Sequence, residues 1–119
     1  MSVLPRIEEE VYEGFYRLGL KEKDEELLEI ARIIASINSG LKMLEEALKT
    51  CDSRKIVYHY GHVMNDIEKL KDLITKRALA FKSLPERVIP LVKLEDMEKE
   101  IKELVTEGIK TCSLKGLIK

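Results

Sequence analysis

Tryptophan and glutamine are absent from the 119 residues, and asparagine occurs only at positions 38 and 65. Glutamate, lysine, leucine and isoleucine are abundant instead. Depletion of heat-labile amides together with enrichment in Lys and Glu is the compositional trend of hyperthermophile proteins. The composition therefore favours a thermophilic source.

Long apolar runs and an excess of one charge are also lacking. No stretch approaches the roughly eighteen apolar residues that a transmembrane helix needs, and the first residues show no secretory-signal pattern. Lys and Arg number 21 against 22 Asp and Glu, for a formal net charge of −1. This balance excludes a wholesale basic coat for nucleic acid and an acidic disordered tail. We expect a cytoplasmic protein with no membrane segment.

The length and the apolar share of 45% predict one domain, residues 1–119, with enough apolar surface for a core. Strand-like alternation is lacking, whereas apolar residues recur at spacings of three and four, as in amphipathic helices. We predict helices over about 5–18, from the charged run 21–26 to Cys51, over about 53–83 and over about 93–112. The predicted fold is all-α, an antiparallel bundle of about four helices with a long central helical hairpin.

Each predicted helix carries an apolar stripe that we expect to face the core. The first stripe is Ile7, Val11, Phe15 and Leu18, with Gly19 as the expected C-cap. The second is Leu27, Ile30, Ile34, Ile37, Leu41, Leu44, Leu48 and Cys51. The third is Ile56, Tyr60, Val63, Ile67, Leu70, Ile74, Ala78 and Phe81. The fourth is Leu94, Met97, Ile101, Leu104 and Val105.

The triplet Asn38-Ser39-Gly40 interrupts the second helical pattern with residues of low helix propensity. Such a triplet ends one helix and begins another, or bends a single long one. Because the heptad register continues across it, we predict one long helix.

The two cysteines, Cys51 and Cys112, do not belong to a Cys-x-x-Cys pair, so their spacing does not indicate a zinc site. Buried free thiols are one interpretation. In an up-down-up-down bundle, however, both cysteines lie at the same end, and thermophile cytosol tolerates structural disulfides. A Cys51–Cys112 disulfide is therefore the second interpretation.

Both histidines, His59 and His62, lie near Asp66 and Tyr58 in the third predicted helix. At about 100° per residue, the two imidazoles and the carboxylate of Asp66 fall within a sector of roughly 60°. Such a set is able to ligate a divalent metal. The chain lacks the Glu-x-x-His pairs of di-iron bundles, however, and we expect no metal or other cofactor.

Arg54, followed by four residues and then His59, resembles the Arg-x4–6-His motif of the HEPN superfamily. Members of that superfamily are small α-helical bundles, and many are metal-independent ribonucleases that act as dimers. The resemblance implies that His59 deprotonates the ribose 2′-hydroxyl or orients the phosphate, and that Arg54 stabilises charge on the phosphate. A HEPN-like ribonuclease is our alternative function.

Basic residues gather at two predicted helix ends, which suggests nucleic-acid binding as a second alternative. Lys76, Arg77 and Lys82 lie without an acid in residues 73–82, and three lysines lie in residues 110–119. Residues 94–103 are acidic, with five acids and two lysines. The helix macrodipole favours acids at helix starts and bases at helix ends, and this accounts for most of these clusters.

The sequence therefore favours a small non-enzymatic bundle that acts through protein–protein association, with a protein partner or with copies of itself in a homo-oligomer. Wide apolar stripes in so small a domain leave surface for a second copy to cover. The tail also keeps Leu114, Leu117 and Ile118 where chain ends are usually polar. These side chains either fold back on the bundle or contact a partner.

Overall fold

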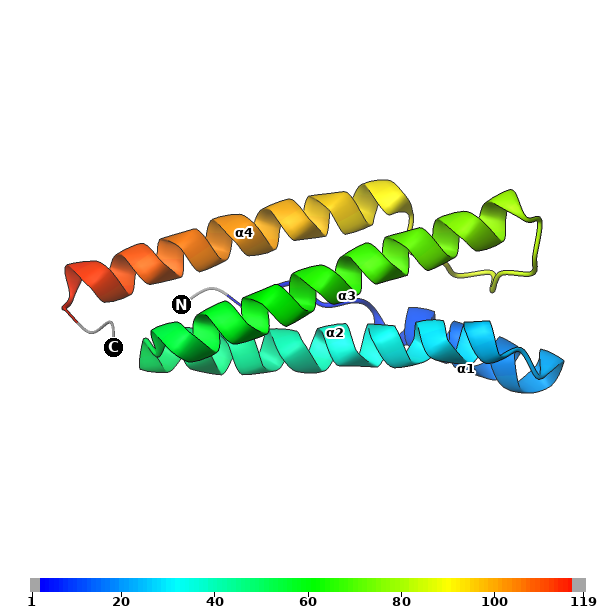
Figure 1. The fold of residues 1–119 in the computed structure, drawn as a ribbon, viewed down its shortest axis with the longest axis horizontal. Coiled ribbons are helices and arrows are strands. Elements are labelled where there is room, and N and C mark those ends of the chain that lie inside the picture. Colours follow the sequence, from blue (N-terminus) through cyan, green and yellow to red (C-terminus); the bar gives the residue numbers. More distant parts are fainter. Residues whose placement is uncertain (1–2, 117–119) are drawn as a thin grey trace.

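The computed structural model describes residues 3–116 and folds them into four α-helices (Figure 1). They are α1 (Glu9–Glu22), α2 (Glu25–Thr50), α3 (Ser53–Leu79) and α4 (Leu91–Leu114). The described residues contain no strand, so the predicted all-α class is confirmed. None of these helices combines the length and the apolar content needed to cross a bilayer.

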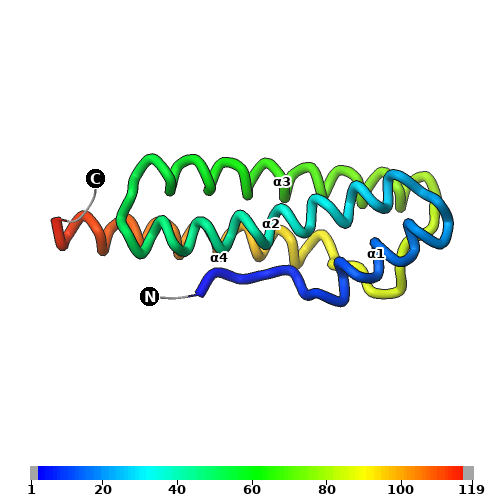
Figure 2. The backbone as a smooth tube through the Cα atoms, turned by 90° about the horizontal axis from the view of Figure 1, so that it is seen from below, coloured from blue at the N-terminus to red at the C-terminus, as the bar shows by residue number. Residues whose placement is uncertain are grey.

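Consecutive helices run antiparallel, and α2 and α3 form the long central hairpin that the sequence predicts (Figures 1 and 2). The molecule is elongated, with principal extents of 52 × 23 × 19 Å. Its radius of gyration is 15.9 Å, whereas a compact chain of this length has about 13.5 Å. The core is therefore a thin layer that follows the hairpin.

The predicted stripe of α2 is confirmed, because all eight of its residues are buried. The triplet at 38–40 lies inside one continuous helix, as predicted. A Cβ at Gly40 would lie 2.8 Å from Cγ2 of Val63, so the missing side chain lets α3 approach α2 closely. Asn38, the other weak helix former, has a partner in the N-terminal segment described next.

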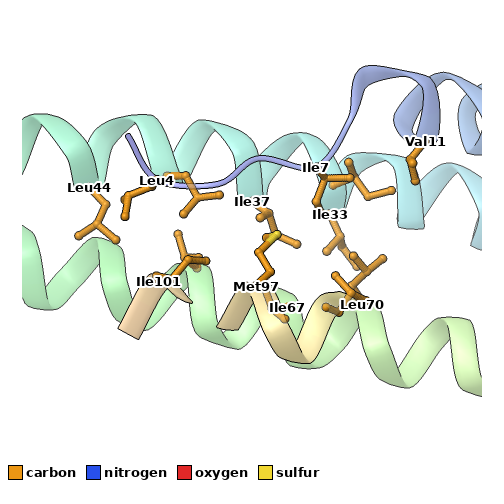
Figure 3. Packing of buried hydrophobic residues seen from close by; sticks show 14 of the residues in the cluster. Leu4, Ile7, Val11, Ile33, Ile37, Leu44, Ile67, Leu70, Met97 and Ile101 are labelled. Atoms are coloured by element: carbon orange, nitrogen blue, oxygen red, sulfur yellow. The ribbon is translucent and has the colours of Figure 1, made fainter. Parts of the chain in front are cut away.

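The first predicted helix is wrong at both ends. The chain is extended before α1, and Leu4 and Ile7 are buried beside α2 and α4 (Figure 3). The Asn38 side chain forms two 2.9 Å hydrogen bonds with Ile7, accepting from its N–H and donating to its carbonyl. Glu45 accepts from the Leu4 N–H at 2.7 Å. Side chains of α2 thus supply hydrogen-bond partners to backbone groups of this extended segment.

At its other end α1 continues past Gly19, the predicted C-cap, and stops at Lys23 in a left-handed conformation. A Cβ at Gly19 would lie 2.8 Å from a methyl group of Leu28. This glycine therefore permits close packing of α1 on α2 and does not end the helix.

The predicted stripe of α3 is confirmed from Ile56 to Ile74, with Tyr60 half-buried, but wrong at Ala78 and Phe81, which are both exposed. The helix ends at Leu79, and the chain turns through Phe81 in a left-handed conformation. The N–H of Lys82 bonds to the Arg77 carbonyl and that of Phe81 to the Ala78 carbonyl, which is the Schellman pattern. This turn carries the ring of Phe81 away from the core.

Arg77 lies on the buried side of α3, where apolar residues are expected, and its side chain is 1% exposed. Its guanidinium donates to the carbonyl of Ser83 at 2.6 and 3.1 Å and to Glu26 at 2.8 Å. It also lies 3.2 Å from Asp24, which caps α2. One buried cation therefore joins the end of α3, the start of α2 and the α3–α4 connection.

The Arg77 contacts also set the charge state of Asp24. Partial burial raises the pKa of this carboxyl, but hydrogen bonds from the Leu27 and Glu26 N–H groups, with the Arg77 charge, outweigh burial and lower it overall. A lowered pKa means that the ionised Asp24 stabilises the fold above its ordinary titration range. That contribution is lost as the pH falls through the lowered value.

The fourth helix begins two residues earlier and ends two residues later than predicted. Leu94, Met97, Ile101 and Val105 are buried, and Leu104 is half-buried, so its stripe is confirmed. At its C-terminal end a disulfide joins Cys112 to Cys51, with the two Cα atoms 5.7 Å apart. Leu114 is exposed, while Leu117 and Ile118 of the tail lie outside the described residues.

We expect Arg77→Ala to lower the free energy of unfolding by about 3 kcal/mol, because it leaves two carboxylates and a carbonyl without their partner. Arg87→Ala is the matched control, since Arg87 forms an exposed ion pair with Glu8 at 3.0 Å. Arg87→Ala should lower the free energy of unfolding by less than about 1 kcal/mol. Urea unfolding followed by circular dichroism measures both values. Equal losses in the two variants would contradict the role assigned to Arg77.

We also expect alkylation of the unfolded, unreduced protein to leave its mass unchanged, because Cys51 and Cys112 are bonded. Reduction should lower the free energy of unfolding by about 4 kcal/mol, as the crosslink closes a loop with a sequence separation of 61. The Cys51→Ser/Cys112→Ser variant is the control, and reductant should not change its stability. Two alkylated thiols without reductant would show that the protein carries free cysteines.

Candidate functional site

The aromatic cluster of Tyr58, His59 and His62 lies on the N-terminal half of α3. Tyr58 is 61% exposed, and its ring contacts both imidazoles, at centroid distances of 5.2 Å to His59 and 4.5 Å to His62. His59 is half-buried and His62 is exposed. The structure thus brings together the three aromatic residues that the sequence singled out, on the surface of the bundle.

Asp66, the third metal-ligand candidate, is engaged elsewhere. It accepts a 2.8 Å hydrogen bond from the hydroxyl of Ser36 on α2, so it bridges the two helices of the hairpin. Across residues 3–116 there is no group of three His, Cys, Asp or Glu side chains arranged to hold a metal ion. His59 and His62 therefore present two imidazoles without a third ligand from the described part of the chain.

Arg54 and His59, the candidate catalytic pair, lie on different sides of α3. Five residues along a helix correspond to a rotation of about 140° between their side chains. Arg54 is exposed in the first turn, whereas His59 is half-buried. The two residues of one chain therefore do not converge on a single phosphate.

The basic end of α3 does not form a three-residue cationic surface. Arg77 is buried and Lys76 is paired with Asp72 at 2.9 Å, which leaves Lys82 exposed beside them. The helical register indicates that Arg77 is buried, because it follows the buried Leu70 by seven residues and the buried Ile74 by three.

A groove between α3 and α4 is a surface that the sequence did not single out. It is an open surface groove with a volume of about 640 Å³. Half-buried Tyr60 and Met64 contribute its apolar lining from α3, and Glu95, Lys99 and Lys102 line it from α4. The acidic run 94–103 was its only signal in the sequence.

Lys71 ties the two sides of this groove together by contacts of 2.6 Å to Glu98 on α4 and 2.9 Å to Glu68 on α3. Hydrogen bonds to both carboxylates raise the pKa of Lys71, so the ammonium stays charged. The hydrogen bond from Lys71 lowers the pKa of Glu68. Burial raises the pKa of Glu98 despite its contact with Lys71. Lys71 therefore forms ion pairs with two carboxylates, those of Glu68 and Glu98.

No protein-family model, curated protein sequence or solved structure matches the chain.

Gly61 lies beside the aromatic cluster, and a Cβ added there meets no atom within 4 Å. We expect Gly61→Ala to raise the free energy of unfolding by up to about 1 kcal/mol, because alanine costs a helix less entropy than glycine. Gly40→Ala is the matched control and should lower it by about 1–2 kcal/mol through the contact with Val63. Denaturant unfolding of dilute protein measures both. Destabilisation by Gly61→Ala would contradict an open position.

Proposed function

We propose that this protein acts by binding other protein chains, as a small non-enzymatic helical module that associates with itself. A cytoplasmic location and a thermophilic source belong to the same proposal and rest on the composition. The catalytic alternative receives less support, since Arg54 and His59 of one chain face different directions.

Exposed apolar side chains around the α3–α4 connection carry the proposal. Leu79 at the end of α3 is 75% exposed, Phe81 in the connection is 95% exposed and Val92 at the start of α4 is 67% exposed. All three lie within fourteen residues of the sequence, and large exposed apolar side chains are typical of interaction surfaces. Binding to another chain would remove them from water.

Phe81 adds a backbone argument. Its φ of 55° places it at the position of a Schellman turn where glycine is usual. A left-handed conformation costs an L-residue about 1–2 kcal/mol, and the exposed ring offsets none of that cost. A strained, exposed aromatic residue is typical of a binding site, where the strain is retained for function.

Sedimentation velocity and native mass spectrometry from about 1 to about 200 µM test the proposal, since association follows mass action. We expect the mean mass to exceed that of one chain and to rise with concentration. RNA incubated with wild type and with His59→Ala should show equal, background cleavage. A chain that stays monomeric over this range would contradict self-association. Cleavage that disappears in His59→Ala would replace the proposal with the ribonuclease.

A further inference from the structure

The last turns of α4 have few attachments to the bundle besides the disulfide. Between Thr106 and Gly116, Cys112 is the only buried residue. Among residues 3–116, no ion pair joins this segment to another helix. Figures 1 and 2 show the C-terminal end of α4 extending past the turn between α2 and α3. The Cys51–Cys112 bond is therefore the main link that holds this end in place.

The preceding part of α4 is held by the core. Its buried residues, which share one apolar cluster with residues of α2 and α3, are Leu94, Met97, Ile101 and Val105. Gly108 lies just after this part, and its low helix propensity makes the helix easier to open there. Residues up to Val105 are thus anchored without the disulfide, whereas residues 106–114 depend on it.

A surface pocket with a volume of about 440 Å³ lies beside the disulfide, and both cysteines line it. Leu48 and Leu104 contribute apolar side chains to the same pocket. Its volume falls within the range of about 300–1,000 Å³ that is typical of small-molecule sites. Because Cys51 is 5% and Cys112 is 4% exposed, access to the bond from solvent depends on this pocket.

The charged residues of the pocket favour thiol chemistry. Lys49 and Lys115 line it, and Glu107 is the only acid that the described residues contribute. In thiol–disulfide exchange one thiolate attacks a sulfur atom and another thiolate leaves. Nearby positive charge stabilises thiolates. The excess of lysine in the lining therefore favours exchange at the Cys51–Cys112 bond.

We propose that the Cys51–Cys112 bond is a reversible redox link, which low-molecular-weight thiols or dithiols reach through this pocket, and that its reduction releases residues 106–114 of α4. A small thiolate attacks one cysteine sulfur, forms a mixed disulfide with it and expels the other cysteine as a thiolate. A second small thiol group then attacks the mixed disulfide and expels the first cysteine. Overall, two electrons and two protons pass to the cysteines, and the two small thiol groups leave as a disulfide. This inference goes beyond the proposed association and does not depend on it.

The end of α2 already offers the reduced cysteine an acceptor. Sγ of Cys51 lies 3.7 Å from the carbonyl oxygen of Leu48, and Sγ of Cys112 lies 3.6 Å from the same oxygen. A thiol S–H is a weak donor, so this carbonyl is able to accept from Cys51 after reduction. Reduction therefore leaves no unpaired donor at the end of α2 when α4 moves away.

Hydrogen–deuterium exchange with and without dithiothreitol tests the release. Dithiothreitol should reduce the bond in the absence of denaturant, and alkylation should then label two thiols per chain. We expect the amides of residues 106–114 to exchange at least about tenfold faster after reduction, because the helix end opens locally. Residues 94–104 should still be protected when residues 106–114 are fully deuterated. Reoxidation should restore slow exchange.

The Cys51→Ser/Cys112→Ser variant is the control for the reductant, and its residues 106–114 should exchange rapidly with and without dithiothreitol. A bond that is reduced only after unfolding in urea would overturn the redox link and leave a structural crosslink. Exchange that is equal before and after reduction would overturn the release. Loss of protection in residues 94–104 together with residues 106–114 would also overturn it, because the whole of α4 would then open.

Thr111→Trp tests the route, since Thr111 lines the pocket and an indole would fill it. Thr106→Trp is the matched control, because Thr106 is exposed on the same helix and does not line the pocket. Both hydroxyls donate to the carbonyl four residues earlier, so both substitutions remove the same contact. We expect Thr111→Trp to slow reduction by dithiothreitol about tenfold and Thr106→Trp to leave its rate unchanged, with circular dichroism to confirm folding. Reduction of Thr111→Trp as fast as that of Thr106→Trp would overturn the pocket as the route.

Discussion

The buried face of α2 supports the rest of the molecule, because α1, α3, α4 and the N-terminal segment all pack on it. α2 has 26 residues, which is long for so small a chain, and the core along it is one layer thick. Each contact with α2 therefore stabilises a different part of the fold. Three glycines allow neighbouring helices to lie close to α2. Gly40 admits Val63 of α3 and Gly108 of α4 admits Leu48, while Gly19 of α1 admits Leu28. Substituents at these positions would push neighbouring helices away from α2.

Local sequence predicts the helices well, because apolar periodicity records which side of each helix is buried. The stripe from Leu27 to Cys51 was therefore identified in full, even across Asn38-Ser39-Gly40. The N-terminal segment was not, since its conformation depends on Asn38 and Glu45, which lie 31 and 41 positions away from the residues they bind. Arg77 likewise depends on Glu26, 51 positions away. Periodicity contains no information about such partners.

The candidate sites show the same division. Tyr58, His59 and His62 were predicted to lie together because helical geometry alone sets their spacing. Asp66 shares their sector of α3, but the neighbouring hydroxyl of Ser36 on α2 engages it. The α3–α4 groove requires the register of two helices that are joined by an irregular connection. The Lys71–Glu98 contact joins the two sides of the groove, and no pattern within either helix predicts it.

Two features that cost the isolated chain stability lie along one side of α3. Gly61 and Leu79 are eighteen residues apart, which is about five turns, so they share one line along the helix. Glycine weakens the helix there, and the exposed leucine gains nothing from burial. Alanine and a polar residue would suit a solvated surface better. In the proposed association such positions would be useful, since a small residue admits another backbone and a large apolar residue gains free energy on burial.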